Sequence, residues 1–199
     1  MNGRFNGLLN ECVFFHKVID GVSLMNIFEA IAKRHSYRGE FQNQPVPRKD
    51  LETIVQAGID APSGCNAQTT SFVVVDDPGL IARIAEIFDN RSVCTTAQAV
   101  IVCLADATPA YGTTSFDRED CAAAVENMLL AITALGYATV WYQGYVQRDG
   151  NDKKIAGLLG VPDRLRVEVV LPIGVPVTAE SPRGKKSLSE RVSFNRFGK

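Results

Sequence analysis

DCAAAVENMLLAITALG, residues 120–136, predicts a helix that is apolar or small in nearly every direction, with Glu126, Asn127 and Thr133 as polar breaks. A helix that is apolar all round is buried all round. It is too short to span a membrane, which takes about 20 mostly apolar residues, and Glu126 lies near its middle. We therefore expect it to pack between a sheet of its own chain and the same helix of a second copy, in a dimer.

The segments on either side alternate between helical and extended patterns. We expect helices at residues 27–35, 47–61, 78–89 and 152–159, and strands at residues 71–76, 99–104, 138–142 and 166–173. Ile27, Ala30, Ile31 and Arg34 share one face of the first helix, and Leu51, Ile54, Val55 and Ile59 are expected to point inward from the second. The pattern predicts a single α+β domain over residues 25–199, with helices on both faces of a central sheet. Residues 1–24 are interpreted as an N-terminal extension of unknown role.

The charge and the cysteine content of the chain limit which kinds of partner and which compartment we expect. The chain has 21 Lys and Arg against 22 Asp and Glu, so it lacks an overall field for nucleic acid or a membrane. Basic residues gather in the last 19 residues, which favours one local anion as ligand, with a solvated charged terminus as the alternative. The five cysteines form no CxxC pair and indicate reduced thiols, so we expect a cytoplasmic protein.

Several catalytic signatures are missing from the sequence. It contains no GxGxxG fingerprint, no P-loop and no GxSxG elbow. Its only histidines, His16 and His35, offer little for a catalytic triad or a metal site, and we expect no metal. An enzyme without its own acid, base or metal usually takes its chemistry from an organic cofactor.

Four stretches suggest such a cofactor. They are RHSYR (34–38), APSGCNAQ (61–68), LGYATVWYQGY (135–145), and LPIGVP (171–176) with the basic run after it. Two guanidiniums and a hydroxyl at a helix end suit a phosphate, although alone the first stretch would be an ordinary basic helix terminus. In this order the four stretches resemble the nitroreductase family of FMN-dependent oxidoreductases. The resemblance implies a mainly antiparallel sheet in an intertwined homodimer, with a long central helix and two FMN sites at the interface.

The resemblance also implies a set of cofactor-binding residues. It names no catalytic side chain, because flavin N5 carries the chemistry. Residues 34–38 and the basic run would hold the phosphate and ribityl chain, residues 61–68 would reach the flavin bound mainly to the other subunit, and the backbone amides near residues 143–144 would face N5 and O4. The set is Arg34, His35, Ser36, Arg38, Pro62, Ser63, Gly64, Asn66, Asn90, Trp141, Tyr142, Gln143, Gly144, Arg183 and Lys185.

The chain departs from the family pattern at three places. Thr69 and Thr70 stand where Pro-Trp is common, Gln143 stands where many relatives have Glu, and Val93 stands where a Lys is expected. The first change predicts a smaller, more polar pocket wall. The other two leave open whether flavin contacts or reactivity differ.

The implied activity transfers hydride from NAD(P)H through flavin N5 to an electron-poor acceptor, such as a nitroaromatic or a quinone, in two half-reactions at one open pocket. One alternative is a specialised flavoenzyme of the same fold, of the dehalogenase, flavin-fragmenting or azoline dehydrogenase type. Others are an FMN-binding protein without turnover and a structural dimer without cofactor.

Overall fold

The computed structural model describes residues 18–19, 22–23 and 25–198 and has the predicted α+β fold. Its main sheet has four strands in the order β3-β4-β6-β5, and every neighbouring pair is antiparallel. These strands are β3 (Thr70–Val75), β4 (Ala99–Asp106), β5 (Ala138–Thr139) and β6 (Leu165–Gly174). A separate antiparallel pair joins β1 (Val18–Ile19) to β2 (Val22–Ser23). The rest of the interpreted N-terminal extension, residues 1–24, lies outside the described residues.

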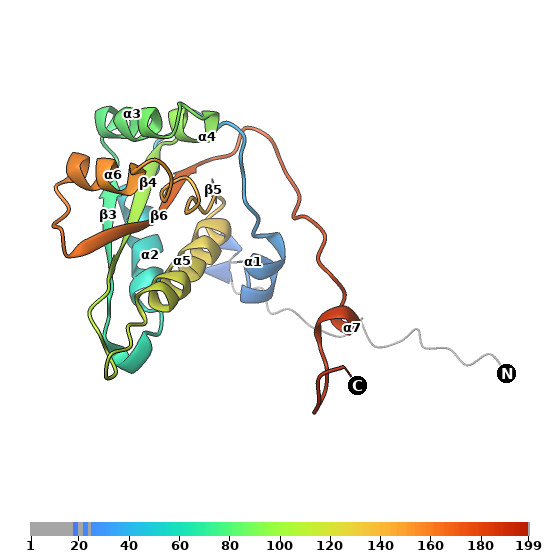
Figure 1. Ribbon diagram of the computed structural model, residues 1–199. Coiled ribbons are helices and arrows are strands. Elements are labelled where there is room, and N and C mark those ends of the chain that lie inside the picture. The colour runs from blue at the N-terminus through green and yellow to red at the C-terminus, as the bar shows by residue number, and fades with distance from the viewer. Residues whose placement is uncertain (1–17, 20–21, 24, 199) are drawn as a thin grey trace.

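Helices cover both faces of the main sheet (Figure 1). One face carries α3 (Pro78–Ile87), α4 (Ser92–Thr95) and α6 (Asn151–Leu159), and the other carries α2 (Arg48–Ile59) and α5 (Asp117–Ala134). Alternate residues of β4 belong to the two core clusters, which is why this strand reads as a continuous apolar run. The remaining helices are α1 (Ile27–Lys33), which packs against α5, and α7 (Leu188–Arg191).

The central helix α5 begins one turn earlier than predicted, at Asp117. It lies close to α2, since a Cβ on Gly58 would come 2.9 Å from Met128 Cγ. Away from the sheet, the Glu126 side chain is 49% exposed and Leu135 is 39% exposed. Within one chain α5 is therefore not buried all round, because α1 and the Arg34 side chain, which pairs with Glu126 at 3.4 Å, cover this side only in part.

Apolar side chains of α1 and α2 are exposed as well. Ile27 and Ile31 of α1 are 54% and 53% exposed, although Ala30 between them is buried. Ile59 was expected to point inward from α2, but it lies at the last residue of that helix and is 59% exposed. The predicted strand at residues 138–142 ends early, at Thr139, because the chain leaves the ladder and touches β6 again only at Tyr142.

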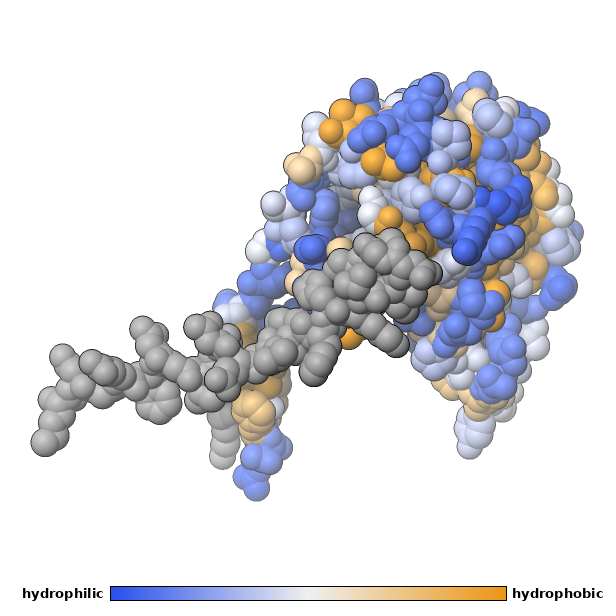
Figure 2. All heavy atoms as spheres, turned by 180° about the vertical axis from the view of Figure 1, so that it is seen from behind, coloured by the Kyte–Doolittle hydropathy of each residue, from blue (hydrophilic) through white to orange (hydrophobic). Residues whose placement is uncertain are grey.

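After β6 the chain runs as an extended segment past α1 to α7, away from the sheet (Figure 1). Its apolar side chains find no cover in the protomer: Leu188 is 71% exposed, Phe194 73% and Phe197 100%. Seen from behind, the main body shows mostly polar residues with smaller apolar areas between them (Figure 2). Within the part of the chain that the structure describes, no helix is long and apolar enough to cross a bilayer.

Candidate functional site

Residues 34–38 follow α1 directly and are held against the edge of the sheet. The Tyr37 N–H donates to the Thr139 carbonyl of β5 at 2.9 Å. The Tyr37 ring is buried, and its hydroxyl donates to the Glu40 carbonyl at 2.6 Å and accepts the Val177 N–H at 3.2 Å. Tyr37 thus fastens this segment both to β5 and to the chain that leaves β6.

The segment after β6 starts beside the same edge. The Gln42 N–H donates to the Val175 carbonyl at 2.8 Å. Gly174, the last residue of β6, lies under the Phe41 ring, and a Cβ there would come 2.6 Å from it. The glycine of LPIGVP therefore permits the close approach that brings the C-terminal segment next to residues 34–38.

The first and fourth stretches meet in one hollow of about 400 Å³. Its lining includes four of the chain's basic side chains and one acid, so the hollow has a net positive charge. The lining residues are Arg34, His35, Ser36, Arg38, Glu180, Ser181, Pro182, Arg183 and Lys185. All six residues predicted from these two stretches are therefore brought together.

His35 shows that the hollow suits a polar ligand. Its Nδ1 lies 2.9 Å from the Lys33 carbonyl, which assigns the proton of the neutral ring to Nδ1. Nε2 is then an acceptor; it is buried and has no hydrogen-bond partner among the described residues. A buried acceptor without a partner costs free energy, and a hydroxyl donor in the hollow would remove that cost.

The loop at residues 61–68 lies at the beginning of α5. Its 3₁₀ turn, Gly64–Asn66, is tied to the helix by Asp120, whose carboxylate accepts the Gly64 N–H at 2.8 Å and the Thr69 hydroxyl at 2.6 Å. A Cβ on Gly64 would come 2.2 Å from the Phe116 ring. The loop can therefore approach α5 this closely only because residue 64 is glycine.

The loop and the basic hollow are separate in the protomer. Pro62 and Ser63 line a smaller hollow of about 70 Å³ between α2, β3 and α5, whereas Asn66 is exposed. The structure thus does not bring the predicted residues of the second stretch into the hollow of the first and fourth.

The third stretch, residues 135–145, contains β5 and contacts β6 again at Tyr142. Trp141 packs beside the α5 core, whereas the Tyr142 ring lies in the opposite core, 5.4 Å from Phe88 and 5.3 Å from Tyr145 between ring centres. Burial raises the pKa of Tyr142 to about 12, so its hydroxyl keeps its proton at neutral pH. At Tyr142 only the backbone therefore remains available to a ligand, whereas Trp141 and Gln143 are partly buried and Gly144 is exposed.

Asn90 is exposed in a turn after α3, with a φ of 52°. The next residue places this turn beside the third stretch, because the Arg91 guanidinium lies 4.1 Å from the centre of the Tyr145 ring. Val93 is buried in the core. The position where relatives are expected to carry a Lys therefore cannot present a charge here.

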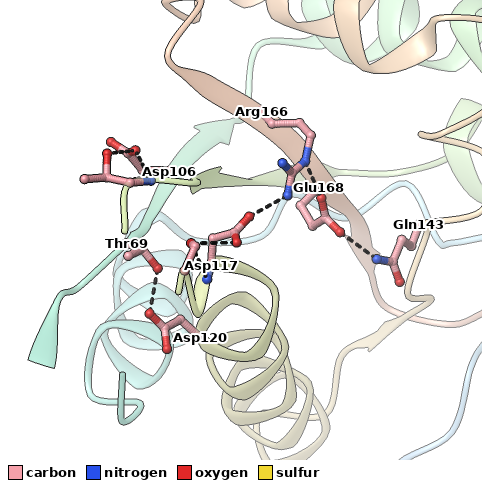
Figure 3. Close-up of polar contacts among 9 residues, drawn as sticks. Thr69, Asp106, Asp117, Asp120, Gln143, Arg166 and Glu168 are labelled. Carbon is pink, nitrogen blue, oxygen red and sulfur yellow. Dashed lines mark hydrogen bonds and ion pairs between the residues drawn. The ribbon is translucent and has the colours of Figure 1, made fainter. Parts of the chain in front are cut away.

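A buried polar network joins α5, β6 and the third stretch, and the sequence reasoning missed it (Figure 3). Glu168 accepts from Gln143 Nε2 at 2.8 Å and from Arg166 Nε at 2.8 Å. Arg166 Nη2 also donates to Asp117 at 2.7 Å, and Asp117 accepts the Ser115 hydroxyl at 2.8 Å. The available signal was the pair of charged residues, Arg166 and Glu168, in the first half of a strand whose remaining side chains are apolar.

The ionisation of this network follows from its pairing. Burial alone would raise the pKa of Asp117, but hydrogen bonds from Arg166 and Ser115 outweigh it and hold that pKa below its ordinary value. Burial likewise opposes the charge of Arg166, while its bonds to Glu168 and Asp117 raise its pKa.

Comparison with known proteins assigns the chain to a family. It matches the sequence model of the Nitroreductase family over residues 31–104 and 90–175. The chain belongs to the nitroreductase family. The resemblance of the four stretches is thereby confirmed at the level of family and fold.

Individual members of the nitroreductase family are similar over most of the chain. A protein of Archaeoglobus fulgidus, provisionally named NADH dehydrogenase/NAD(P)H nitroreductase, is 34% identical over 138 residues, or 68% of this chain and 78% of that protein. An FMN-dependent nitroreductase of Clostridium difficile superposes with a TM-score of 0.73 at 26% identity, covering 84% of this chain and 98% of the other. An iodotyrosine deiodinase of Thermotoga neapolitana is 25% identical and covers 87% of this chain and all of that protein.

Proposed function

We propose that this nitroreductase family member is an FMN-dependent oxidoreductase that uses NAD(P)H to reduce an electron-poor acceptor, such as a nitroaromatic or a quinone. The main support is the basic hollow, in which Arg38, Arg183 and Lys185 meet from opposite ends of the domain. A side chain set of this kind suits a phosphate. The buried, unpartnered Nε2 of His35 in the same hollow suits a ribityl hydroxyl.

We assign the chain's residues the following roles. Arg34, Arg38, Arg183 and Lys185 neutralise the phosphate, Ser36 donates to it, and His35 accepts from the ribityl chain. Bound FMN would supply the hydride chemistry that no side chain here provides. The backbone amides at residues 143–144 would donate to the reacting edge of the ring, where they stabilise negative charge without an ionisable group. Trp141, Tyr142 and Asn90 would contribute wall and backbone contacts.

We also propose that the complete site needs two copies of the chain. The loop carrying Pro62, Ser63, Gly64 and Asn66 lies apart from the basic hollow of its own protomer. The partly covered side of α5 and the exposed apolar residues of α1 offer the surface through which a second copy could bring its loop to that hollow. This arrangement would explain why so apolar a helix is left partly open in one chain.

An absorbance spectrum of the purified protein, recorded from 300 to 600 nm before and after anaerobic addition of NADPH or NADH, tests the proposal. We expect flavin bands that bleach on addition and return when a quinone is supplied. A colourless protein that stays so after incubation with FMN would refute it. Flavin bands that no nicotinamide bleaches would indicate an FMN-binding protein without this turnover.

The deiodinase relative supports a second candidate, reductive dehalogenation at the same flavin site. Its substrate would be a halogenated phenol such as a halotyrosine. Halide release measured with an ion-selective electrode, with the flavin held reduced by dithionite, tests this activity. Quinone reduction without any halide release would leave the first proposal standing alone.

A further inference from the structure

Strand β6 contains a β-bulge at Glu168. Cys103 of β4 pairs with Val169 and Leu104 pairs with Val167, so Glu168 has no partner on β4. An extra residue of this kind redirects a side chain, and bulges are common beside active sites.

The bulge changes which face of the sheet each side chain meets. Val169 and Leu171 pack in the core under α5, and Val167 and Val170 pack in the core on the other face. Regular alternation would have put Val167 on the same face as Val169. At the bulge Glu168 belongs to neither apolar cluster, and its carboxylate accepts hydrogen bonds from Arg166 and Gln143.

Each oxygen of the Glu168 carboxylate accepts a hydrogen bond although the residue is almost completely buried. The residue is 2% exposed, and one oxygen accepts from Gln143 while the other accepts from Arg166. A buried carboxylate is unfavourable unless it is paired and hydrogen-bonded, and an apolar residue would fill a strand position at lower cost. Its presence between Val167 and Val169, in the buried part of the strand, therefore calls for a purpose beyond packing.

The Glu168 carboxylate holds the side chain of Gln143. Immediately before Gln143 in the chain, Tyr142 exchanges two backbone hydrogen bonds with Val170, at 3.1 and 2.9 Å. On the other side of Gln143, Gly144 is exposed. Glu168 thus holds the first residue after the Tyr142–Val170 bridge, and this residue belongs to the peptide assigned to the reacting edge of the flavin.

We propose that Glu168 is a positioning residue that fixes the peptide between Gln143 and Gly144 for the cofactor, with Arg166 and Asp117 holding the carboxylate in turn. The proposal rests on the proposed function. Catalytic and binding groups must be held within a fraction of an ångström, and side chains locked by a second set of hydrogen bonds do this. Gln143 suits the task because its amide donates to a carboxylate, whereas Glu at this position would repel one.

A charge swap tests the proposal, with E168Q, Q143E and the double variant Q143E/E168Q compared with the unaltered protein. E168Q removes the charged acceptor, and Gln143 can then keep a hydrogen bond only by rotating its carboxamide so that its oxygen accepts from the introduced amide. Q143E sets two carboxylates against each other. The double variant again has one carboxylate and one carboxamide and can satisfy every partner. D106N is the matched control, because it breaks the Asp106–Arg164 pair, 2.9 Å apart, without touching Gln143.

The readout is the Kd for FMN, from quenching of flavin fluorescence in dimeric apoprotein, together with the melting temperature of each variant. We expect each single variant to bind FMN about tenfold more weakly, the worth of one hydrogen bond to a charged group. The double variant should recover to within about threefold, and D106N should match the unaltered protein. If E168Q does not fold, the comparison of Q143E with the double variant carries the same test.

A purely structural role for Glu168 would lower the melting temperature and leave the Kd unchanged, and this would overturn the proposal. A double variant no better than the single ones would also overturn it. Either result leaves the proposed function intact if the unaltered protein binds FMN and NADPH bleaches the flavin bands. An unaltered protein that binds no FMN would remove both.

Discussion

Removal of the two basic side chains that the C-terminal segment brings to the hollow gives the sharpest test of the phosphate site. In Arg183→Ala/Lys185→Ala both changes are at exposed positions, so the fold should be retained. A hydrogen bond to a charged group is worth about 1.5–3 kcal/mol, and exposure argues for the lower end. Two such bonds give about 3 kcal/mol, which is about a 100-fold increase in the Kd for FMN.

The assay compares two ligands with apoprotein: FMN, and riboflavin, which lacks the phosphate. Only FMN affinity should fall, and the difference between the ligands should shrink at high salt because exposed charges are screened. Lys49→Ala/Arg83→Ala removes the same charge from exposed sites elsewhere and should change neither affinity. An equal loss for both ligands, or no loss for FMN, would refute the assignment of these residues to the phosphate.

Three further predictions concern stability and assembly. Gly64→Ala would place a Cβ 2.2 Å from the Phe116 ring, so the free energy of unfolding in urea should fall by about 1–3 kcal/mol, and an unchanged midpoint would contradict the close approach. The pKa of Asp117 is lower in the fold than its ordinary value of 3.8 because its hydrogen bonds outweigh its burial, so its stabilising contribution is present above that pH and lost as the pH falls through the folded pKa. Asp117→Asn should therefore unfold more easily at pH 7 and lose less stability on acidification, and a parallel pair of stability curves would argue against this. Ile31→Glu alters a side chain that is 53% exposed in the protomer and would lie at the proposed dimer interface. This variant should fold but elute as a monomer with light-scattering detection, whereas Lys33→Glu should elute like the unaltered protein. A dimeric Ile31→Glu would exclude this face from the proposed interface.

The elements were largely readable from local patterns. The alternation of β4 between two cores produces the apolar run that predicted it, and Gly160 ends α6 in the left-handed conformation expected of a terminal glycine. Positions at the ends of elements were predicted less well. Ile59 follows the helical period, but the helix ends there and leaves nothing for the side chain to pack against.

Some residues of the candidate site could likewise be predicted from the sequence, and others could not. The stretches around Arg34, Asn66, Gln143 and Arg183 could be recognised because the proposed backbone and phosphate contacts would require particular residues at short spacing. The network through Glu168 could not, because its members lie in different elements and meet only through a bulge, which shifts side chains between faces without leaving a pattern in the sequence.

The sequence by itself thus determined the family, the order of helices and strands and the residue types suited to a phosphate, since these depend on neighbours along the chain. Only the tertiary structure decided that residues 34–38 share a hollow with the C-terminal segment and that the loop at residues 61–68 lies apart from it. It also decided that a buried carboxylate holds Gln143. These facts depend on how β5, β6 and α5 pack, and packing between distant segments is set by the summed fit of many side chains rather than by any local spacing.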